Sequence, residues 1–357
     1  MRSKFQLSHN GYMNRLLTVL LACVSLPLLG QDLTMSRGFP KPDFLLHTEL
    51  NDEKPHTVLG PMKTDSQGRT TGSFAVYGSS SLVQVTSLSF SGDGKSLVVG
   101  STPGTVDIWD METRTRLGSF AAGSTVALSP DGRLLATDGN DIRIWEVSSR
   151  KVLTRMPWGG ATIRRMSFDP SGTWIVVRAN GKNDTVYDVK AGQEIVSLTN
   201  TQEAEFSRDG LIVIGGNAKR VISWSTKDWS QTRDLSNGPD YVTRFAVNPS
   251  KDLVIVGGPN SARLMRLSSG EEVAKLGTGY TNFAAFDRTG SLIFTYTASG
   301  FGVWDTAGKL LCSAKDVGNG TMALSDDNRW LAASPVGGGR DVTLWKVENI
   351  FKTCTKS

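Results

Sequence analysis

The chain has 357 residues, of which 39% are hydrophobic and 20% are charged, proportions that are usual for a soluble globular protein. Its formal net charge is +5, and it would be +2 without the three basic residues among the first 15, so the chain lacks the dense basic face of a nucleic-acid-binding protein. The three cysteines, Cys23, Cys312 and Cys354, are too few for a disulfide scaffold and form no CxxC metal site.

Residues 1–30 have the composition of a secretory signal peptide. The first 15 residues contain no acidic side chain, and residues 16–29 are almost wholly apolar. This run is too short to span a bilayer, which takes about 20 residues, but it matches the apolar region of a signal peptide. We therefore expect cleavage after Gly30, with Met13 as an alternative start of translation, and a secreted or periplasmic protein.

Two alternatives to secretion stay open. Leu20-Leu21-Ala22-Cys23 is similar to a lipobox, which would make the protein a membrane-anchored lipoprotein, although the apolar run continues past Cys23. The segment could also be retained uncleaved as an anchor. We expect contact with a membrane only in these two cases. Residues 31–68 are polar, contain four prolines and show no period, so they predict a linker or irregular strap.

Residues 69–352 contain one turn motif that recurs seven times at intervals of 38 to 41 residues. Asp, Asn or Ser at its first position can cap the backbone, Pro often presets φ at the second, and Gly often supplies a positive φ at the fourth. The seven copies begin at Ser91, Ser129, Asp169, Ser207, Asn248, Asp287 and Ser325.

Each turn connects two predicted strands. An apolar residue stands directly before every turn and another two positions earlier, a period of two that predicts a strand with one buried face. The position between them is small in six copies, as an innermost strand near a central axis requires, and is Glu205 in the fourth. A third strand ends in a large side chain, and a short fourth strand follows. The large residues are Trp109, Trp145, Tyr187, Trp224, Met265, Trp304 and Trp345.

Seven units of four strands and about 40 residues predict an all-β fold, a seven-bladed β-propeller with four antiparallel strands per blade. These residues resemble the WD-repeat (WD40) family over positions 69–352. The family's Gly-His pair is absent, because no histidine follows His56, and only Asp141 and Asp341 keep its loop aspartate, so the resemblance is to a divergent branch. It implies a scaffold for protein interactions rather than an enzyme.

Closure of the ring needs a strand from the other end of the chain. Residues 69–75 echo the fourth strand of the first unit, residues 114–120, so we expect the N-terminal segment to complete the seventh blade. The competing choice is the segment 350–355, and residues 353–357 would otherwise form a C-terminal tail. Cys312 and Cys354 would then lie on outer strands of adjacent blades, too far apart for a disulfide, and we predict no bond between them.

The sequence predicts no catalytic site, metal site or cofactor. The segment 92–96 resembles a phosphate loop, 167–174 a sialidase Asp-box, and 337–340 a glycine-rich anion loop, but a repeat turn or a loop between strands explains each one. The repeats contain no histidine, so a Ser-His-Asp triad lacks its base and a metal site lacks imidazole.

What remains is recognition at the surface. WD-repeat propellers usually bind partners with the loops before the first strand and between the second and third, and Trp, Tyr and Arg are enriched in binding hot spots. We predict that Glu203 and Glu205 join Arg165 and Arg244 in a charge cluster at the top of the channel. The candidate contact residues are Trp158, Arg164, Arg165, Arg178, Glu203, Glu205, Tyr241, Arg244, Tyr280 and Tyr296.

We therefore predict a monomeric scaffold that binds a protein or peptide on one propeller face. The alternative is an enzyme or small-ligand binder that uses the central channel. Several buried, paired carboxylates or arginines at the channel mouth would favour the ligand, whereas a broad exposed aromatic patch would favour a partner protein.

Overall fold

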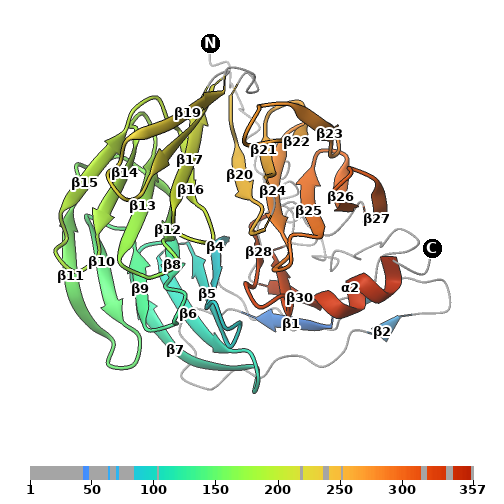
Figure 1. Ribbon diagram of the computed structural model, residues 1–357. Coiled ribbons are helices and arrows are strands. Elements are labelled where there is room, and N and C mark those ends of the chain that lie inside the picture. Colours follow the sequence, from blue (N-terminus) through green and yellow to red (C-terminus); the bar gives the residue numbers. More distant parts are fainter. Residues whose placement is uncertain are drawn as a thin grey trace, which may run out of the picture.

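The computed structural model describes residues 43–47, 63–64, 70–71 and 84–354, apart from 103, 218–219, 236–240, 251, 315–319 and 335–340. Seven four-stranded antiparallel sheets form the blades of a β-propeller, whose innermost strands meet around the centre of the ring (Figure 1). The predicted fold is confirmed. The predicted signal peptide and the glycine-rich loop at 337–340 lie outside the described residues.

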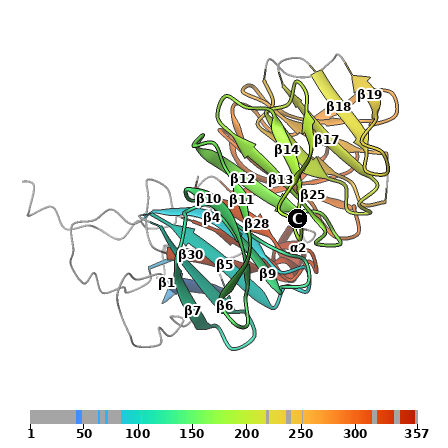
Figure 2. The same ribbon diagram turned by 90° about the vertical axis from the view of Figure 1, so that its left-hand side faces the viewer.

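Each of the first six blades follows the chain from its innermost strand at the channel to its outermost strand at the periphery, where β7 and β19 lie in Figure 2. The first three blades are β4 (Val85–Phe90), β5 (Ser96–Ser101), β6 (Thr105–Asp110) and β7 (Thr115–Ala121); β8 (Val126–Leu128), β9 (Leu134–Thr137), β10 (Asp141–Glu146) and β11 (Lys151–Pro157); and β12 (Ile163–Phe168), β13 (Trp174–Ala179), β14 (Asp184–Asp188) and β15 (Glu194–Leu198).

The next three blades repeat this order, and the predicted turns connect the first two strands of every blade. These blades are β16 (Glu203–Phe206), β17 (Ile212–Asn217), β18 (Arg220–Ser225) and β19 (Gln231–Leu235); β20 (Arg244–Val247), β21 (Val254–Gly257), β22 (Ala262–Met265) and β23 (Glu272–Lys275); and β24 (Thr281–Phe286), β25 (Leu292–Thr297), β26 (Gly300–Asp305) and β27 (Leu310–Ala314).

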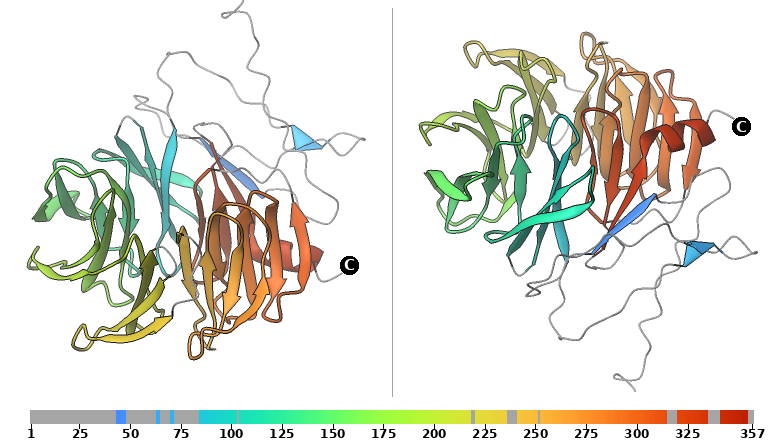
Figure 3. Two further views of the ribbon diagram at one scale, coloured as in Figure 1. Left: turned by 90° about the horizontal axis from the view of Figure 1, so that it is seen from above. Right: turned by 90° about the horizontal axis from the view of Figure 1, so that it is seen from below.

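The seventh blade joins the two ends of the propeller. It consists of β28 (Met322–Leu324), β29 (Trp330–Ala333), β30 (Asp341–Lys346) and, as its outermost strand, β1 (Phe44–His47). Figure 3 shows β1, from the start of the chain, beside β30 near its end. An N-terminal strand does close the ring, but our prediction that residues 69–75 provide it is wrong. Thr70–Thr71 (β3) pairs instead with Lys63–Thr64 (β2).

Polar and apolar contacts together hold β1 in place. The Asp43 carboxylate accepts hydrogen bonds from the backbone N–H of Lys346 at 2.6 Å and from the Asn349 side chain at 2.7 Å. Leu46 is fully buried, and the Phe44 ring packs edge-on against Trp330. A closing strand must bury an apolar side chain in this way, which the polar Arg-Thr-Thr segment at 69–71 does not offer.

The C-terminal segment, our competing choice for closure, forms the helix α2 (Val347–Cys354) instead of a strand. Val347 and Ile350 of this helix pack into the core shared by the sixth and seventh blades. Our prediction of no bond between Cys312 and Cys354 stays a prediction, although Cys312, in β27, is disulfide-bonded. Its partner lies outside the described side chains. Our distance argument had assumed that Cys354 lies on an outer strand, whereas this residue ends a helix.

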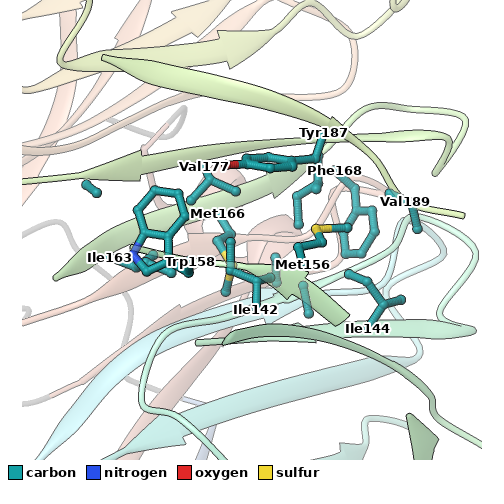
Figure 4. Packing of buried hydrophobic residues seen from close by; sticks show 14 residues of the cluster. Ile142, Ile144, Met156, Trp158, Ile163, Met166, Phe168, Val177, Tyr187 and Val189 are labelled. Atoms are coloured by element: carbon teal, nitrogen blue, oxygen red, sulfur yellow. The ribbon is translucent and has the colours of Figure 1, made fainter. Parts of the chain in front are cut away.

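The hydrophobic core lies between the faces of neighbouring blades. Figure 4 shows the part between the second and third blades, where Ile142 and Met156 of one blade meet Met166 and Val177 of the next. Complete burial of such a side chain stabilises the fold by about 1.5–3 kcal/mol. A single blade would expose these faces, so only the ring buries them all.

Hydroxyl side chains near the start of the innermost strands link neighbouring blades. The Thr86 hydroxyl donates to the Ser124 carbonyl at 2.6 Å, and that of Thr243 to the Thr281 carbonyl at 2.9 Å. The ring is closed in the same way by a bond from the Thr321 hydroxyl to the Thr86 carbonyl at 3.0 Å. Hydrogen bonds from one blade to the next thus connect the innermost strands around the ring.

The indole groups of Trp145 and Trp304 form hydrogen bonds within their own blades. The indole N–H of Trp145 donates to the Thr137 hydroxyl at 3.0 Å, and that of Trp304 to Thr295 at 2.8 Å. The Asp141 carboxylate instead forms ion pairs with two arginines of its own blade.

Candidate functional site

The innermost strands enclose a channel of about 490 Å³. Small side chains such as Ser89, Ala127 and Ala246 line its wall, as the sequence predicts, and Glu205 is the exception among them. We call the end with the loops before the innermost strands the upper mouth. The opposite end, formed by the seven repeat turns, is the lower mouth.

A charge cluster occupies the upper mouth. The carboxylate of Glu203, in β16, has no solvent exposure and pairs with Arg178, with Arg165 at 3.4 Å and with Arg244 at 3.7 Å. Arg165 also pairs with Glu205 at 3.1 Å. The predicted cluster of Glu203, Glu205, Arg165 and Arg244 therefore forms, and Arg178 completes it. We call these five residues the upper cluster.

Backbone geometry positions the arginines of the upper cluster. Arg165 and Arg178 are direct partners on the neighbouring strands β12 and β13. The Arg244 guanidinium donates to the backbone carbonyls of Asn282 and Thr243, each at 2.8 Å. These bonds hold three guanidinium groups around one buried carboxylate, and they leave part of each arginine accessible, with 25–37% of the side chain exposed.

The upper cluster keeps its positive charges at neutral pH. Burial, together with the neighbouring arginines, lowers the pKa of Arg178 and of Arg244 to about 10, which is still well above neutrality. Three guanidinium groups then face the two carboxylates of Glu203 and Glu205, so one net positive charge is left over.

Sequence reasoning missed Asp184, a further acidic residue beside the upper cluster. It begins β14, is fully buried, and lies close enough to Arg178 for the two to interact electrostatically. Burial raises the pKa of Asp184 to about 7, and the positive charge of Arg178 opposes this only in part. No sequence signal distinguishes this position from those of other aspartates near strand ends.

Two exposed tyrosines border the upper cluster. Tyr241 is 42% and Tyr280 44% exposed, and their ring centroids lie 6.2 Å apart. They stand in the loops before β20 and β24, and Tyr280 lies near both Arg178 and Arg244. An exposed aromatic pair beside accessible guanidinium groups combines two residue types that are enriched in binding hot spots.

The other three predicted contact residues lie outside the upper cluster, although Arg164 lines the same channel. Trp158 is buried between the second and third blades, edge-on to Tyr187 with ring centroids 6.5 Å apart (Figure 4). Tyr296 is buried in the core of the sixth blade. Arg164 is exposed, but its guanidinium binds the side chain of Asn180 at 2.8 Å.

The lower mouth has an ion pair that the sequence did not indicate. Arg208, in the turn of the fourth blade, approaches Asp326, in the turn of the seventh, with 2.8 Å between its Nη2 and the Asp326 Oδ1. The same nitrogen donates to the backbone carbonyl of Asp326 at 2.8 Å. These two blades stand on opposite sides of the channel, so the pair spans its lower end.

Neither a metal site nor a membrane span emerges within the described parts of the chain. Those residues contain no group of three or more His, Cys, Asp or Glu side chains placed to hold a metal ion. They also contain no helix of sufficient length and apolarity to cross a bilayer.

Comparison with known proteins finds one family match and several relatives that are similar over part of the chain. Residues 72–110 match the family described as WD domain, G-beta repeat. The chain is 28% identical over 153 residues to pre-mRNA-processing factor 19 homolog 2 of Arabidopsis thaliana, a match that covers 39% of this chain and 29% of that protein.

Two other relatives show the same partial similarity. The small ribosomal subunit protein RACK1 of Caenorhabditis elegans is 30% identical over 99 residues, which is 26% of this chain and 30% of that protein. Coronin-7 of Bos taurus is 25% identical over 189 residues, which is 49% of this chain and 20% of that protein. The chain thus spans less than a third of the length of each relative.

Proposed function

Since the chain belongs to the WD40-repeat family of β-propellers, we propose that it is a non-catalytic scaffold that binds a protein or peptide around the upper mouth of its channel. Propellers of this family are in general protein-interaction scaffolds rather than enzymes. The observation that carries the proposal is the exposed pair Tyr241 and Tyr280 beside the upper cluster.

The upper mouth combines rigidity with accessible contact groups. Arg244 is fixed by two backbone carbonyls, so little side-chain entropy remains to be lost when a partner binds. The excess positive charge of the upper cluster favours an acidic side chain on the partner, chiefly through a faster association. Truncation of an aromatic hot spot typically costs about 2 kcal/mol or more of binding free energy.

An affinity pull-down tests this proposal. The chain from residue 31 onward is used as bait, and the captured proteins are compared with those captured by a double variant, Tyr241→Ala with Tyr280→Ala. Leu211→Ala serves as the control, since Leu211 is 66% exposed next to the lower mouth. We expect the same proteins to be lost from the tyrosine variant and kept by the control. Unchanged capture by the tyrosine variant would show that partners bind elsewhere.

One observation favours a second candidate, a binder of small anions at the upper mouth. Glu203 is a buried, paired carboxylate at the mouth of a channel of about 490 Å³, which is the feature we expected of a ligand site. A thermal shift assay with succinate and with inorganic phosphate separates the two candidates. A concentration-dependent rise in Tm would support binding of a small anion. An unchanged Tm would favour the function as a scaffold for a protein partner.

We further propose that the protein is exported. The apolar run at residues 16–29 supports this, and so does the disulfide at Cys312, because disulfides persist mainly in oxidising compartments. Fractionation of cells that express the full chain, with N-terminal sequencing of the product, tests it. A soluble product that begins near Gln31 is expected. Palmitate labelling that is lost in Cys23→Ser would instead indicate the lipoprotein.

A further inference from the structure

A polar groove lies over the outer strands of the third blade and the loop that joins it to the fourth, and it shares no lining residue with the channel. Its volume of about 550 Å³ is in the usual range for small-molecule sites. Thr185 and Tyr187 of β14 and their cross-strand partners Ser197 and Glu194 of β15 contribute to its wall, and Trp158 reaches it from the loop after β11. We call it the blade-three groove.

The lining of the blade-three groove is rich in groups that both donate and accept hydrogen bonds. Among the described residues that line it there is no aliphatic side chain, but there are four carboxamides, Asn183, Asn200, Gln202 and Asn217. Each carboxamide offers an oxygen acceptor and two N–H donors, and the serine and threonine hydroxyls of the groove also act in both ways. Such a lining matches a ligand with many neutral hydroxyl or amide groups.

Charge narrows the class of ligand further. Lys182 and Glu194 are the only charged residues in the described lining, and their charges cancel. A nucleotide or an acidic saccharide would be expected to meet several cations, usually including arginine. A peptide would need apolar or aromatic anchor pockets, and aliphatic ones are lacking here.

An ordered aromatic residue borders the groove. The indole N–H of Trp158 donates to the Ala161 carbonyl at 2.6 Å, which fixes the ring, and the Lys182 ammonium lies 4.6 Å from its centroid. The face of an aromatic ring carries partial negative charge and attracts positively charged groups. The weakly positive C–H face of a sugar ring suits the same position, which the flexible lysine can vacate.

We propose that the blade-three groove binds a neutral saccharide, with its hydroxyl groups on the carboxamides and one sugar ring against Trp158. This site is separate from the upper mouth, so the inference does not depend on the proposed scaffold function. Ordinary protein partners at the upper mouth and a saccharide on the third blade could bind at the same time.

Titration of the intact chain with oligosaccharides tests the inference. The probes are a tetramer of N-acetylglucosamine and maltotetraose, which are neutral, and tetragalacturonate, which is acidic. Calorimetry gives the affinity. We expect at least one neutral probe to bind and a double variant, Asn183→Ala with Gln202→Ala, to weaken it about tenfold or more. Both side chains are exposed, so their replacement should leave the Tm unchanged.

Two control variants show whether a bound saccharide lies in the blade-three groove and not elsewhere. Lys182→Ala uncovers the Trp158 ring, so neutral probes should bind equally well or more tightly, whereas an acidic ligand would bind less tightly. The double tyrosine variant of the upper mouth should bind the saccharide unchanged. The inference is overturned if neither neutral probe binds, if only tetragalacturonate binds, or if the carboxamide variant binds as the unaltered chain does.

Discussion

The two mouths of the channel are both bridged by arginine–carboxylate pairs, but the two arrangements differ in burial and in number of partners. At the upper mouth, three arginines from adjacent blades surround the fully buried Glu203. At the lower mouth, a single arginine, Arg208, crosses the ring to Asp326, whose side chain is 59% exposed. The same type of ion pair is therefore buried at the upper mouth and exposed to water at the lower mouth.

This difference determines what each mouth can contribute. A buried charge has lost its hydration, so removing its counter-charge costs much free energy of unfolding. The groups around such a charge must therefore keep fixed positions. An exposed pair is screened by water and salt and contributes little to stability. The upper mouth is thus a rigid, preorganised surface, whereas the lower mouth is a weak link between opposite blades.

The largest expected effect is that of Glu203→Gln. The substitution leaves Arg178, Arg165 and Arg244 close together without the carboxylate that they share. Breaking a buried ion pair by removing one partner typically costs about 3–5 kcal/mol, and we expect a loss of that size in the free energy of unfolding, measured by urea denaturation.

Glu205→Gln is the matched control for this prediction. Glu205 lies two residues further along the same strand and forms an ion pair with Arg165. Its side chain is 22% exposed, so its loss should cost about 1 kcal/mol or less. Equal losses for the two variants would show that the burial of Glu203 does not set the energetics of the upper mouth.

A smaller, pH-dependent effect is expected of Asp184→Asn. The pKa of Asp184 is about 7 in the folded protein, against 3.8 for an unperturbed aspartate. Between these two values the unfolded chain has released the proton while the folded protein still binds it. Stability therefore falls as the pH rises from about 4 to about 7, by up to about 4 kcal/mol.

The side chain of the Asp184→Asn variant does not titrate, so its contribution to the unfolding free energy does not fall between pH 4 and pH 7. The difference in unfolding free energy between Asp184→Asn and the unaltered chain should increase in favour of the variant from pH 4 to pH 7 and then stay constant. Glu112→Gln, which removes an exposed carboxylate, controls for the change in net charge. A difference that does not vary with pH would show that Asp184 ionises normally in the fold.

The repeat made both the blades and part of the upper cluster predictable from the sequence. Arg165, Glu203 and Arg244 stand at equivalent places near the start of successive innermost strands, so a ring brings them together. The apolar period of two fixes which side of each strand is buried, and the turn residues fix where it ends. Seven copies of this local information are enough to define the architecture.

The sequence was least informative where the repeat does not extend. The closing strand β1 has only four residues and lies outside the repeats, so its pairing depends on tertiary burial of Leu46 and not on any local pattern. For Trp158 and Tyr296 the sequence indicated loops or strand ends but not the direction of the side chain: Tyr296 points into the core, and Trp158 packs against the core at the edge of the blade-three groove. Contacts across the channel, such as that of Arg208 with Asp326, have no signature in repeat spacing.

The smallest expected effect is that of Arg208→Ala at the lower mouth. Both side chains are partly exposed, so we expect a loss of about 1 kcal/mol or less in unfolding free energy at low salt, and a smaller loss at high salt because the pair is screened. A double-mutant cycle with Asp326→Ala isolates the side-chain pairing, since the arginine also binds the Asp326 backbone carbonyl. A coupling as large as the loss in Glu203→Gln would mean that the lower mouth is a structural latch, and the contrast between the two mouths would then disappear.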